Sequence, residues 1–378
     1  MGSVRKVKYN SGGSGWQARW RDPAGIDRAK NFPRKTDAER YLVGLESDML
    51  RGYYADPRLG RTRLADWLAE WQATRSNLSP ATRLRDEASI RNHVTPALGA
   101  RPIGQIQPIH VGQWVASLKD QGLAPATTRK AYQLLAAAMA AAVDNRLIPL
   151  SPCRKVELPQ IKTAEMRFLD PAEVKLLAGS IDEQYRAMVL TAAYSGLRFG
   201  ELCALRVERL DALRRTIRVE ENLSEVRSQF IFKSPKSDAS RRTVSVPAFL
   251  VDELAQHLST FPDSSGLLFT AQNGGPIRRT NFRRRIWKPA VETSVGEPCT
   301  FHDLRHSHAA ILIAQGEHPK VIQSRLGHAS IKTTLDTYGH LFDGLDEAAA
   351  DRLDEVWTAS NSGEAISRRS HKVVQIRP

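Results

Sequence analysis

Prolines interrupt the chain between its middle and its C-terminal half, and this interruption limits how the 378 residues can fold. Pro149, Pro152 and Pro159 follow one another closely. Because proline lacks a backbone N–H and fixes φ, it ends a helix and favours an extended connection. The sequence therefore predicts a linker at residues 151–167 between separately folded parts. A chain of this length has room for two or three domains, each with its own core.

Residues 1–58 have the pattern of short strands followed by a helix. Residues 16–21 alternate with a period of two, which predicts a strand with apolar residues on one face, namely Trp16, Ala18 and Trp20. Arg19 and Arg21 would lie on the other face, which is either a solvated surface or one that fits a DNA groove; we favour the groove. Lys30 is a weaker DNA-binding candidate, since Phe32 shares its face.

Residues 62–150 have helical periodicity, and residues 131–143 are almost wholly apolar. Two helix starts, at Ser79-Pro80 and Ala124-Pro125, are each followed by basic residues: Arg83, Arg85, Arg129 and Lys130. Helix starts with basic residues commonly contact phosphates. A solvated helix face explains each single residue equally well. Further along, residues 168–357 are again dominated by helices, interrupted by a strand pair near 216–219 and 242–246, and residues 358–378 form a basic tail that we expect to be flexible.

The charge of the chain suggests a polyanionic partner. The formal net charge is +14 and the excess is spread over every region, as a protein that encloses DNA would need. The three cysteines, at 153, 203 and 299, are far apart, which favours a reducing cytoplasm over disulfides or a zinc finger. No run approaches the ~18 apolar residues of a membrane span. We therefore expect a cytoplasmic protein without membrane contact.

A set of motifs in the C-terminal half carries the chemistry. They are Ser195-Gly196-Leu197-Arg198, Ser234-Pro235-Lys236 leading to Ser240-Arg241-Arg242, His302-Asp303-Leu304-Arg305-His306, Leu326-Gly327-His328 and Thr337-Tyr338. Together they supply arginines that can clamp phosphoryl oxygens, histidines and a lysine that can move protons, and a phenol that can become a covalent carrier. That inventory requires no metal and no cofactor.

In the order and spacing of these motifs the chain resembles a tyrosine recombinase, more narrowly a phage-type integrase with an N-terminal arm-binding domain. The resemblance implies a mainly α fold with small β elements (α+β): an arm-type DNA-binding domain of three strands and a helix at 1–58, a helical core-binding (SAM-like) domain at 62–150, and a catalytic domain at 168–357. Its implied catalytic residues are Arg198, Lys236, His302, Arg305, His328 and Tyr338. Glu201 and Asp303 would orient the basic residues.

For the lysine and the histidines, the sequence alone also allows another interpretation. Lys236 would protonate the 5′-oxygen leaving group, but a mobile surface lysine fits the sequence equally well. His302 and His306 are four residues apart, which is also metal-ligand spacing. We give zinc little weight because a third ligand is missing from the motif, and we expect His306 to support helix packing.

The resemblance also implies the partners: double-stranded DNA with core-type and arm-type attachment sites, a homotetramer on that DNA, an excisionase and a DNA-bending host factor. The setting would be the cytoplasm and nucleoid of a bacterial host. Cleavage would pass through a 3′-phosphotyrosyl link and a four-way junction, in integration and in excision. Two alternatives remain, a type IB topoisomerase and a DNA-binding protein without chemistry. The arm-binding domain and a docking helix at 345–357 argue against the first, and the full catalytic set against the second.

Overall fold

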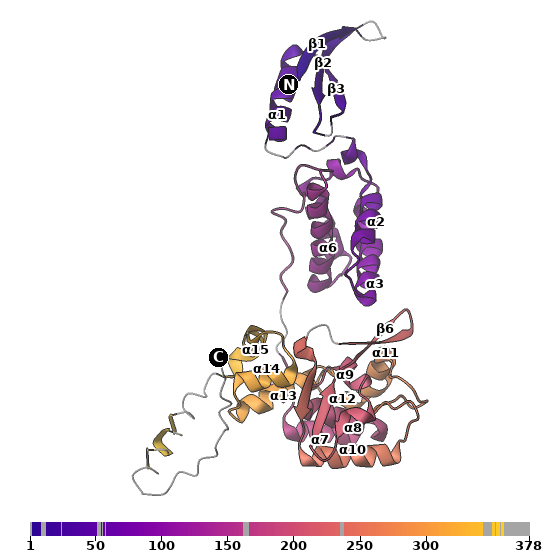
Figure 1. Cartoon of the computed structure of the whole chain (residues 1–378), viewed down its shortest axis with the longest axis vertical. Coiled ribbons are helices and arrows are strands. Elements are labelled where there is room, and N and C mark those ends of the chain that lie inside the picture. The colour runs from indigo at the N-terminus through magenta and orange to yellow at the C-terminus, as the bar shows by residue number, and fades with distance from the viewer. Residues whose placement is uncertain are drawn as a thin grey trace. The chain divides into compact units, whose positions relative to one another are not determined.

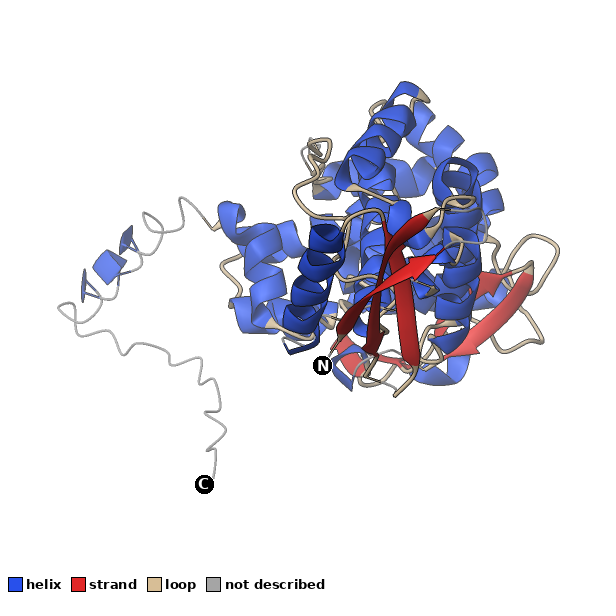
Figure 2. Cartoon of the chain, turned by 90° about the horizontal axis from the view of Figure 1, so that it is seen from above, coloured by secondary structure: helices blue, strands red, loops and turns tan. Residues whose placement is uncertain are grey.

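A computed structural model describes residues 2–8, 13–23, 25–50, 54, 56, 58–161, 166–234, 238–342, 350, 351, 353–355, 357 and 358. The chain divides into two compact units, residues 1–163 and 164–378. Helices predominate, with the strands gathered in small sheets (Figures 1 and 2). The mainly α fold with small β elements is therefore confirmed. The segment expected to dock on another protomer, 345–357, and the tail lie largely outside the described residues.

The N-terminal sheet forms as the alternating pattern predicts. Strands β1 (Ser3–Lys8), β2 (Ser14–Arg21) and β3 (Asp27–Phe32) pair antiparallel in the order β1-β2-β3. Helix α1 (Lys35–Leu50) covers one face, where Ala18 and Trp20 are buried with Leu42 of the helix. Since side chains alternate across a strand, burial of Ala18 and Trp20 leaves Arg19 and Arg21 exposed on the open face.

The middle of the chain is a small helical bundle with its own core. Its helices are α2 (Leu64–Thr74), α3 (Pro80–Ser89), α4 (Thr95–Leu98), α5 (Pro108–Asp120) and α6 (Pro125–Asp144). The helix start at Ser79 is capped as expected, because its Oγ accepts the backbone N–H of Thr82 at 3.2 Å. Trp67 of α2 donates its indole N–H to the Ala138 carbonyl of α6 at 2.9 Å, so burial and hydrogen bonding join these two helices.

The first part of the linker, residues 151–161, has no helix or strand but is attached to this bundle. Cys153, Val156 and Leu158 pack on the helical core. The hydroxyl of Tyr132 donates to the Cys153 carbonyl at 2.9 Å, and Arg129 Nε donates to the Pro159 carbonyl at 2.8 Å. An extended connection was expected here, and the structure adds that it is tied down up to Pro159.

The C-terminal unit is built around α8, a helix buried along most of its length. Its helices are α7 (Pro171–Ser180), α8 (Glu183–Ser195), α9 (Phe199–Cys203), α10 (Ala248–Thr260), α11 (Arg279–Asn281), α12 (Lys288–Ser294), α13 (Asp303–Ala314), α14 (Pro319–Leu326) and α15 (Ile331–Tyr338). Its strands are β4 (Leu210–Asp211), β5 (Thr216–Val219), β6 (Asn222–Val226), β7 (Gln229–Lys233) and β8 (Arg242–Ser245).

The strands of this unit include one hairpin that the sequence pattern did not predict. The expected pair is present, since β5 and β8 are antiparallel with Val219 opposite Arg242. Strands β6 and β7 form a separate two-stranded sheet, joined by Arg227 and Ser228, both with positive φ. The residues usual at such a turn are glycine and asparagine. Because neither glycine nor asparagine occupies positions 227 and 228, the local sequence contains no hairpin signal.

Candidate active site

The hydroxyl of Tyr338 is held inside the C-terminal unit. Tyr338 is the last residue of α15, and only 1% of it is exposed. Its ring belongs to a small apolar cluster that includes Ile313 and Leu326. The hydroxyl oxygen lies 2.8 Å from Nδ1 of His306. Burial raises the pKa of the phenol, while the charges of Arg305 and Arg198 act in the opposite direction. Nearby cations therefore favour the phenolate that a buried tyrosine would otherwise resist forming.

Arg305 is a buried cation held by backbone carbonyls. It lies in the first turn of α13, and 2% of it is exposed. Nη1 donates to the Gly196 carbonyl and Nη2 to the Leu326 carbonyl, both at 2.6 Å. Burial lowers the pKa of this guanidinium and the charge of Arg198 lowers it further, but arginine stays protonated at neutral pH. The fold thus places a fixed positive charge next to Tyr338.

Arg198 approaches the same point from another helix. The chain leaves α8 through Gly196, in the left-handed region at φ 69°, and Arg198 caps the N-terminus of α9. Its side chain is 35% exposed; Nη1 donates to Glu201 at 2.9 Å and Nη2 to the Gly327 carbonyl at 3.4 Å. Arg198 and Arg305 therefore bind the carbonyls of adjacent residues, 327 and 326. The two expected phosphate-clamping side chains converge.

Glu201 is the buried anion that organises the arginines. Its carboxylate accepts from Arg198 and from Arg242, whose Nη1 and Nη2 lie 3.2 and 2.9 Å from its two oxygens. Burial acts to raise the pKa of Glu201, but the hydrogen bonds and charge of Arg242, followed by those of Arg198, outweigh it and lower the pKa. Glu201 therefore stays ionised and holds the guanidinium of Arg198.

Arg242 is a site residue to which sequence reasoning gave no role. It belonged to the quoted motif at 240–242, yet nothing local separates it from Arg241. In the structure Arg241 is exposed, whereas the Arg242 side chain is only 6% exposed. Besides Glu201 it binds the Arg325 carbonyl through Nε at 2.7 Å. The pairing of Arg242 with Glu201 spans 41 residues, so only the fold reveals it.

The two expected histidines both lie near Arg198 and Arg305. His302 is exposed and immediately precedes α13. His328 follows the left-handed Gly327 that ends α14, and its Nδ1 lies 2.9 Å from the hydroxyl of the buried Thr334. Burial, and then the charges of Arg305 and Arg198, lower the pKa of His328 to about 4. His328 is therefore neutral at pH 7, and its ring is oriented by Thr334.

Two other residues of the expected set, Asp303 and Lys236, are not seen in contact with the arginines in the part of the chain that the structure describes. The carboxylate of Asp303 accepts the backbone N–H of Thr300 at 2.7 Å, so it fixes the turn that leads into α13; among the described residues it forms no ion pair with a guanidinium. Lys236 lies outside the described residues. Its neighbours along the chain, β7 ending at Lys233 and β8 beginning at Arg242, are both described.

Buried contacts of His308, and close packing at Gly196 and Gly327, support the backbone that binds the arginines. His308 is buried, with Nδ1 3.0 Å from the Ala193 carbonyl and Nε2 accepting from Arg325 Nε at 3.1 Å. A Cβ on Gly196 would lie 2.7 Å from the His308 ring, and one on Gly327 would lie 2.9 Å from Nη1 of Arg242. Both glycines also have positive φ. Larger residues at 196 or 327 would therefore displace the groups that hold Arg305 and Arg198.

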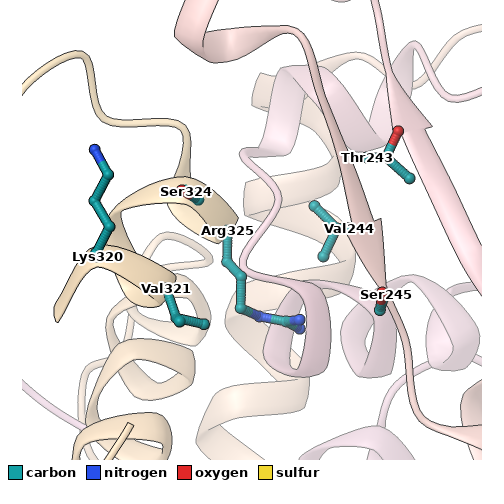
Figure 3. Close-up of a pocket in the computed structure, with 7 residues that line it drawn as sticks. All are labelled: Thr243, Val244, Ser245, Lys320, Val321, Ser324 and Arg325. Carbon is teal, nitrogen blue, oxygen red and sulfur yellow. The ribbon is translucent and has the colours of Figure 1, made fainter. Parts of the chain in front are cut away.

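An open cavity of about 290 Å³ lies beside this centre, between β8 and α14 (Figure 3). Its lining comprises Thr243, Val244, Ser245, Lys320, Val321, Ser324 and Arg325. None of the expected catalytic residues lines it. Arg325 is engaged with His308 and with the Tyr194 carbonyl, so it is part of the support of the active site.

The expected DNA-binding residues of the N-terminal sheet fall on both of its faces. Arg19 and Arg21 are exposed on the open face, and Arg21 Nε donates to the Gly25 carbonyl at 2.7 Å. Lys30 pairs with Ala18 across the strands and lies on the helix side, its Nζ 4.5 Å from the ring centre of Tyr41. Lys30 therefore shares the helix-covered face with Phe32, which made it the weaker DNA-binding candidate, and it lies on the opposite face from Arg19 and Arg21.

The four basic candidates of the helical bundle also differ. Arg83, Arg85 and Lys130 are exposed, whereas Arg129 is half-buried by its contact with the Pro159 carbonyl. Arg83 Nη2 donates to the Arg75 carbonyl at 3.3 Å, and Arg85 lies 3.8 Å from Asp86. Arg129 thus has a structural role in holding the linker.

Neither a metal cluster nor a membrane-spanning helix occurs in the part of the chain that the structure describes. No group of three or more His, Cys, Asp or Glu residues there could hold a metal ion. The rings of His302 and His306 meet edge-on, with their centres 4.8 Å apart. No described helix is long and apolar enough to cross a bilayer.

The fold and this centre of arginines, histidines and tyrosine agree with what known proteins show. A family model described as "Phage integrase family" matches residues 167–344, and one described as "Phage integrase, N-terminal SAM-like domain" matches residues 63–119. The chain belongs to the phage integrase family of tyrosine recombinases.

Individual relatives show similarity over most of the chain. The integrase of Mycobacterium phage D29 is 27% identical over 342 residues, which are 86% of this chain and 89% of the relative. The Tn1549 transposon integrase, solved in complex with a circular intermediate DNA, has a TM-score of 0.69 at 22% identity and covers 77% of this chain and 99% of its own. A lambda integrase tetramer bound to a Holliday junction has a TM-score of 0.56 at 17% identity, covering 87% and 94%. At these identities the two structures support the fold.

Proposed function

We propose that this protein is the integrase of a phage or other mobile element and that Tyr338 cuts and rejoins DNA at specific sites. The observation that carries the proposal is the convergence of Arg198 and Arg305 on the adjacent carbonyls of Gly327 and Leu326, beside the Tyr338 cluster that contains Leu326. Two guanidinium groups at one point suit the two non-bridging oxygens of a phosphodiester. Site-specific recombination is the activity of the family to which the chain belongs.

In the proposed reaction the phenol oxygen of Tyr338 attacks phosphorus. An Oη–P bond forms, the P–O5′ bond breaks, and the DNA is left with a 3′-phosphotyrosyl link and a free 5′-hydroxyl. Arg198 and Arg305 would hold the charge that develops on the non-bridging oxygens, where donors fixed in advance need no rearrangement. Because the covalent link keeps the ester, attack by another 5′-hydroxyl rejoins the strand without ATP.

The leaving 5′-oxygen needs a proton, and Lys236 is proposed to supply it. Lys236 has this role by resemblance and lies outside the described residues. His328, neutral at pH 7 and oriented by Thr334, would donate a hydrogen bond to a phosphoryl oxygen. His302, exposed before α13, would bind a phosphate oxygen. Glu201 would keep Arg198 in place, and Asp303 would fix the turn that carries His302.

The partner of this protein is DNA. We propose a separate kind of DNA site for each of its first two domains. Residues 1–58 would bind arm-type sites through Arg19 and Arg21, and residues 62–150 would bind core-type sites through Arg83, Arg85 and Lys130, with Arg129 and Lys30 in supporting positions. Residues 151–167 would link them to a catalytic domain at 168–357. The relative solved as a tetramer on a Holliday junction supports a tetramer and a four-way junction here. We also propose that an excisionase and a DNA-bending host factor are partners, and that the protein acts in the bacterial nucleoid.

Covalent capture tests this function. Parent, Tyr338→Phe and Tyr194→Phe would be incubated, without metal or ATP, with nicked duplexes selected for binding from a random pool. Tyr194 is a half-buried tyrosine whose ring packs on Phe249, so its variant controls for loss of a hydroxyl. We expect a denaturation-resistant adduct with the parent and the control, and bound but unlinked DNA with Tyr338→Phe. An adduct in Tyr338→Phe would remove Tyr338 as nucleophile. Relaxation of supercoiled DNA without recombinant product would favour a topoisomerase instead.

A further inference from the structure

The hydrogen bond of the Tyr338 hydroxyl goes to a histidine outside the expected catalytic set. His306 Nδ1 lies 2.8 Å from Tyr338 Oη, with the ring centres 5.7 Å apart at 60°. His302, one turn earlier, meets His306 edge to face and is exposed. His306 therefore stands between His302 and the proposed nucleophile. Packing alone does not require a ring nitrogen at this position, but a buried phenol requires a partner.

We propose that His306 is a catalytic residue that accepts the proton of Tyr338 as the phenol attacks phosphorus. This inference rests on the function proposed above. The distance between Nδ1 and Oη is within the range required of a general base. His306 also touches one of the two reacting atoms directly, whereas His328 is turned toward Thr334.

The proposed step balances in both directions. The O–H bond of Tyr338 breaks, its proton moves to Nδ1 of His306, and the Oη–P bond forms while P–O5′ breaks. The 5′-oxygen takes its proton from a different group, Lys236. In rejoining, the 5′-hydroxyl attacks and gives its proton back to Lys236, the P–O5′ bond forms as the Oη–P bond breaks, and the imidazolium of His306 returns its proton to the phenolate. The two ends of the reaction thus use separate proton carriers.

The surroundings of His306 suit a base that is neutral before the reaction. Burial lowers its pKa, Asp303 raises it, and the charge of Arg305 lowers it again, with a net decrease. The ring is therefore uncharged at pH 7 and keeps a lone pair for the proton. Asp303 is close enough to stabilise the imidazolium once it forms, which is the favourable arrangement for a group that must carry a charge only briefly.

A leaving-group experiment separates this role from a structural one. The enzymes would be the full-length parent, His306→Gln and His340→Gln, an exposed histidine two residues after Tyr338. Glutamine can still accept the phenol hydrogen bond but is a very weak base. The probes would be the nicked duplexes of the capture assay, with either oxygen or sulfur as the 5′-bridging atom. Because a thiolate leaves without a proton, sulfur relieves defects in leaving-group protonation only.

We expect His306→Gln to bind DNA like the parent and to form adduct roughly 100-fold or more slowly. The deficit should be equal with oxygen and with sulfur, and His340→Gln should match the parent. Restoration by sulfur would move His306 to the leaving group, and an unchanged rate would overturn the proposal. Absence of adduct in the parent would instead reject the proposed function itself.

A second variant covers the case in which glutamine disturbs folding. His306→Ala removes the ring and leaves space beside Tyr338, so imidazole added to the solution can enter and accept the proton. We expect adduct formation by His306→Ala to rise with imidazole concentration, with no response from Tyr338→Phe. A folded, DNA-binding His306→Ala that ignores imidazole and forms adduct at the parent rate would contradict the inference.

Discussion

Arg242 holds the buried carboxylate of Glu201 with two parallel hydrogen bonds, of 3.2 Å through Nη1 and 2.9 Å through Nη2. Both side chains are nearly inaccessible, at 6% and 3% exposure. The same carboxylate binds Arg198, so the position of one proposed phosphate clamp depends on an arginine that need not touch DNA. A fork of this kind requires a planar guanidinium, which lysine cannot replace.

Arg242→Lys should therefore impair cleavage while the charge of the chain is unchanged. Loss of the fork would free Glu201 and allow Arg198 to shift, and a displacement of ~1 Å at such a site can cost about 100-fold in rate. Adduct formation on nicked duplexes, measured at saturating protein, gives that rate. Arg241→Lys is the matched control, since Arg241 is the exposed neighbour. Equal rates for the two variants would show that the fork is dispensable.

His308 should make the C-terminal unit sensitive to acid. Its Nδ1–H donates to Ala193 and its Nε2 accepts from Arg325, an arrangement possible only for the neutral ring. Burial, and then the charge of Arg325, lower its pKa to about 3 from 6.5. Between these values the unfolded chain binds the proton and the folded chain does not. Stability from this group is thus complete above pH 6.5 and falls as the pH drops toward 3, by at most ~1.4 kcal/mol per pH unit.

The variant His308→Asn separates this contribution from other titrations. Its amide can donate to Ala193 but does not titrate, so at pH 7.5 we expect it to be less stable than the parent by about 1–3 kcal/mol, because Arg325 Nε loses its acceptor. That difference should narrow as the pH falls below 6.5. Amide hydrogen exchange of peptides from α8 and α13, compared at each pH, measures it. His340→Asn is the control, and a constant difference across the range would refute the assignment.

Features set by neighbouring residues could be predicted from the sequence. The period of two at residues 16–21 located the buried face of β2, and the Ser79-Pro80 and Ala124-Pro125 pairs marked the starts of α3 and α6. In contrast, the partners of the catalytic groups come from distant segments. Arg305 binds Gly196, which is 109 residues away, and His306 reaches Tyr338 across 32. Nothing in the local pattern distinguishes His306 from a packing residue, because its function depends on where α15 ends.

The hairpin of β6 and β7 shows a second limit. Arg227 and Ser228 take positive φ without being glycine or asparagine, so the turn has no compositional signal, and the strands are held by pairing such as Leu223 with Phe232. Arg278 lies with its guanidinium carbon 4.6 Å from the ring centre of Phe230 and forms an ion pair with Glu225. These contacts join residues 48 and 53 positions apart and stabilise a turn that the local sequence disfavours.

The open face of the N-terminal sheet provides the last prediction. Gln17 accepts from Arg5 Nε at 3.1 Å and donates to Asn31 at 3.0 Å, so a row of polar groups crosses all three strands. Arg19 and Arg21 follow Gln17 along β2 on the same face, and α1 covers the opposite face. A face already ordered by side-chain hydrogen bonds loses little conformational entropy on binding, which suits a surface that reads a groove.

Removal of both arginines, in Arg19→Ala/Arg21→Ala, should weaken binding to arm-type duplexes and leave core cleavage largely intact. Each lost phosphate contact should reduce the slope of log affinity against log salt by about 0.9, which distinguishes direct contact from a general change of charge. Arg34→Ala/Arg40→Ala is the matched control, because it removes the same charge from two exposed positions, one before α1 and one on it. If both double variants lost affinity equally, net charge alone would account for binding. If only the first did, the open face of the sheet would be the surface that binds arm-type DNA.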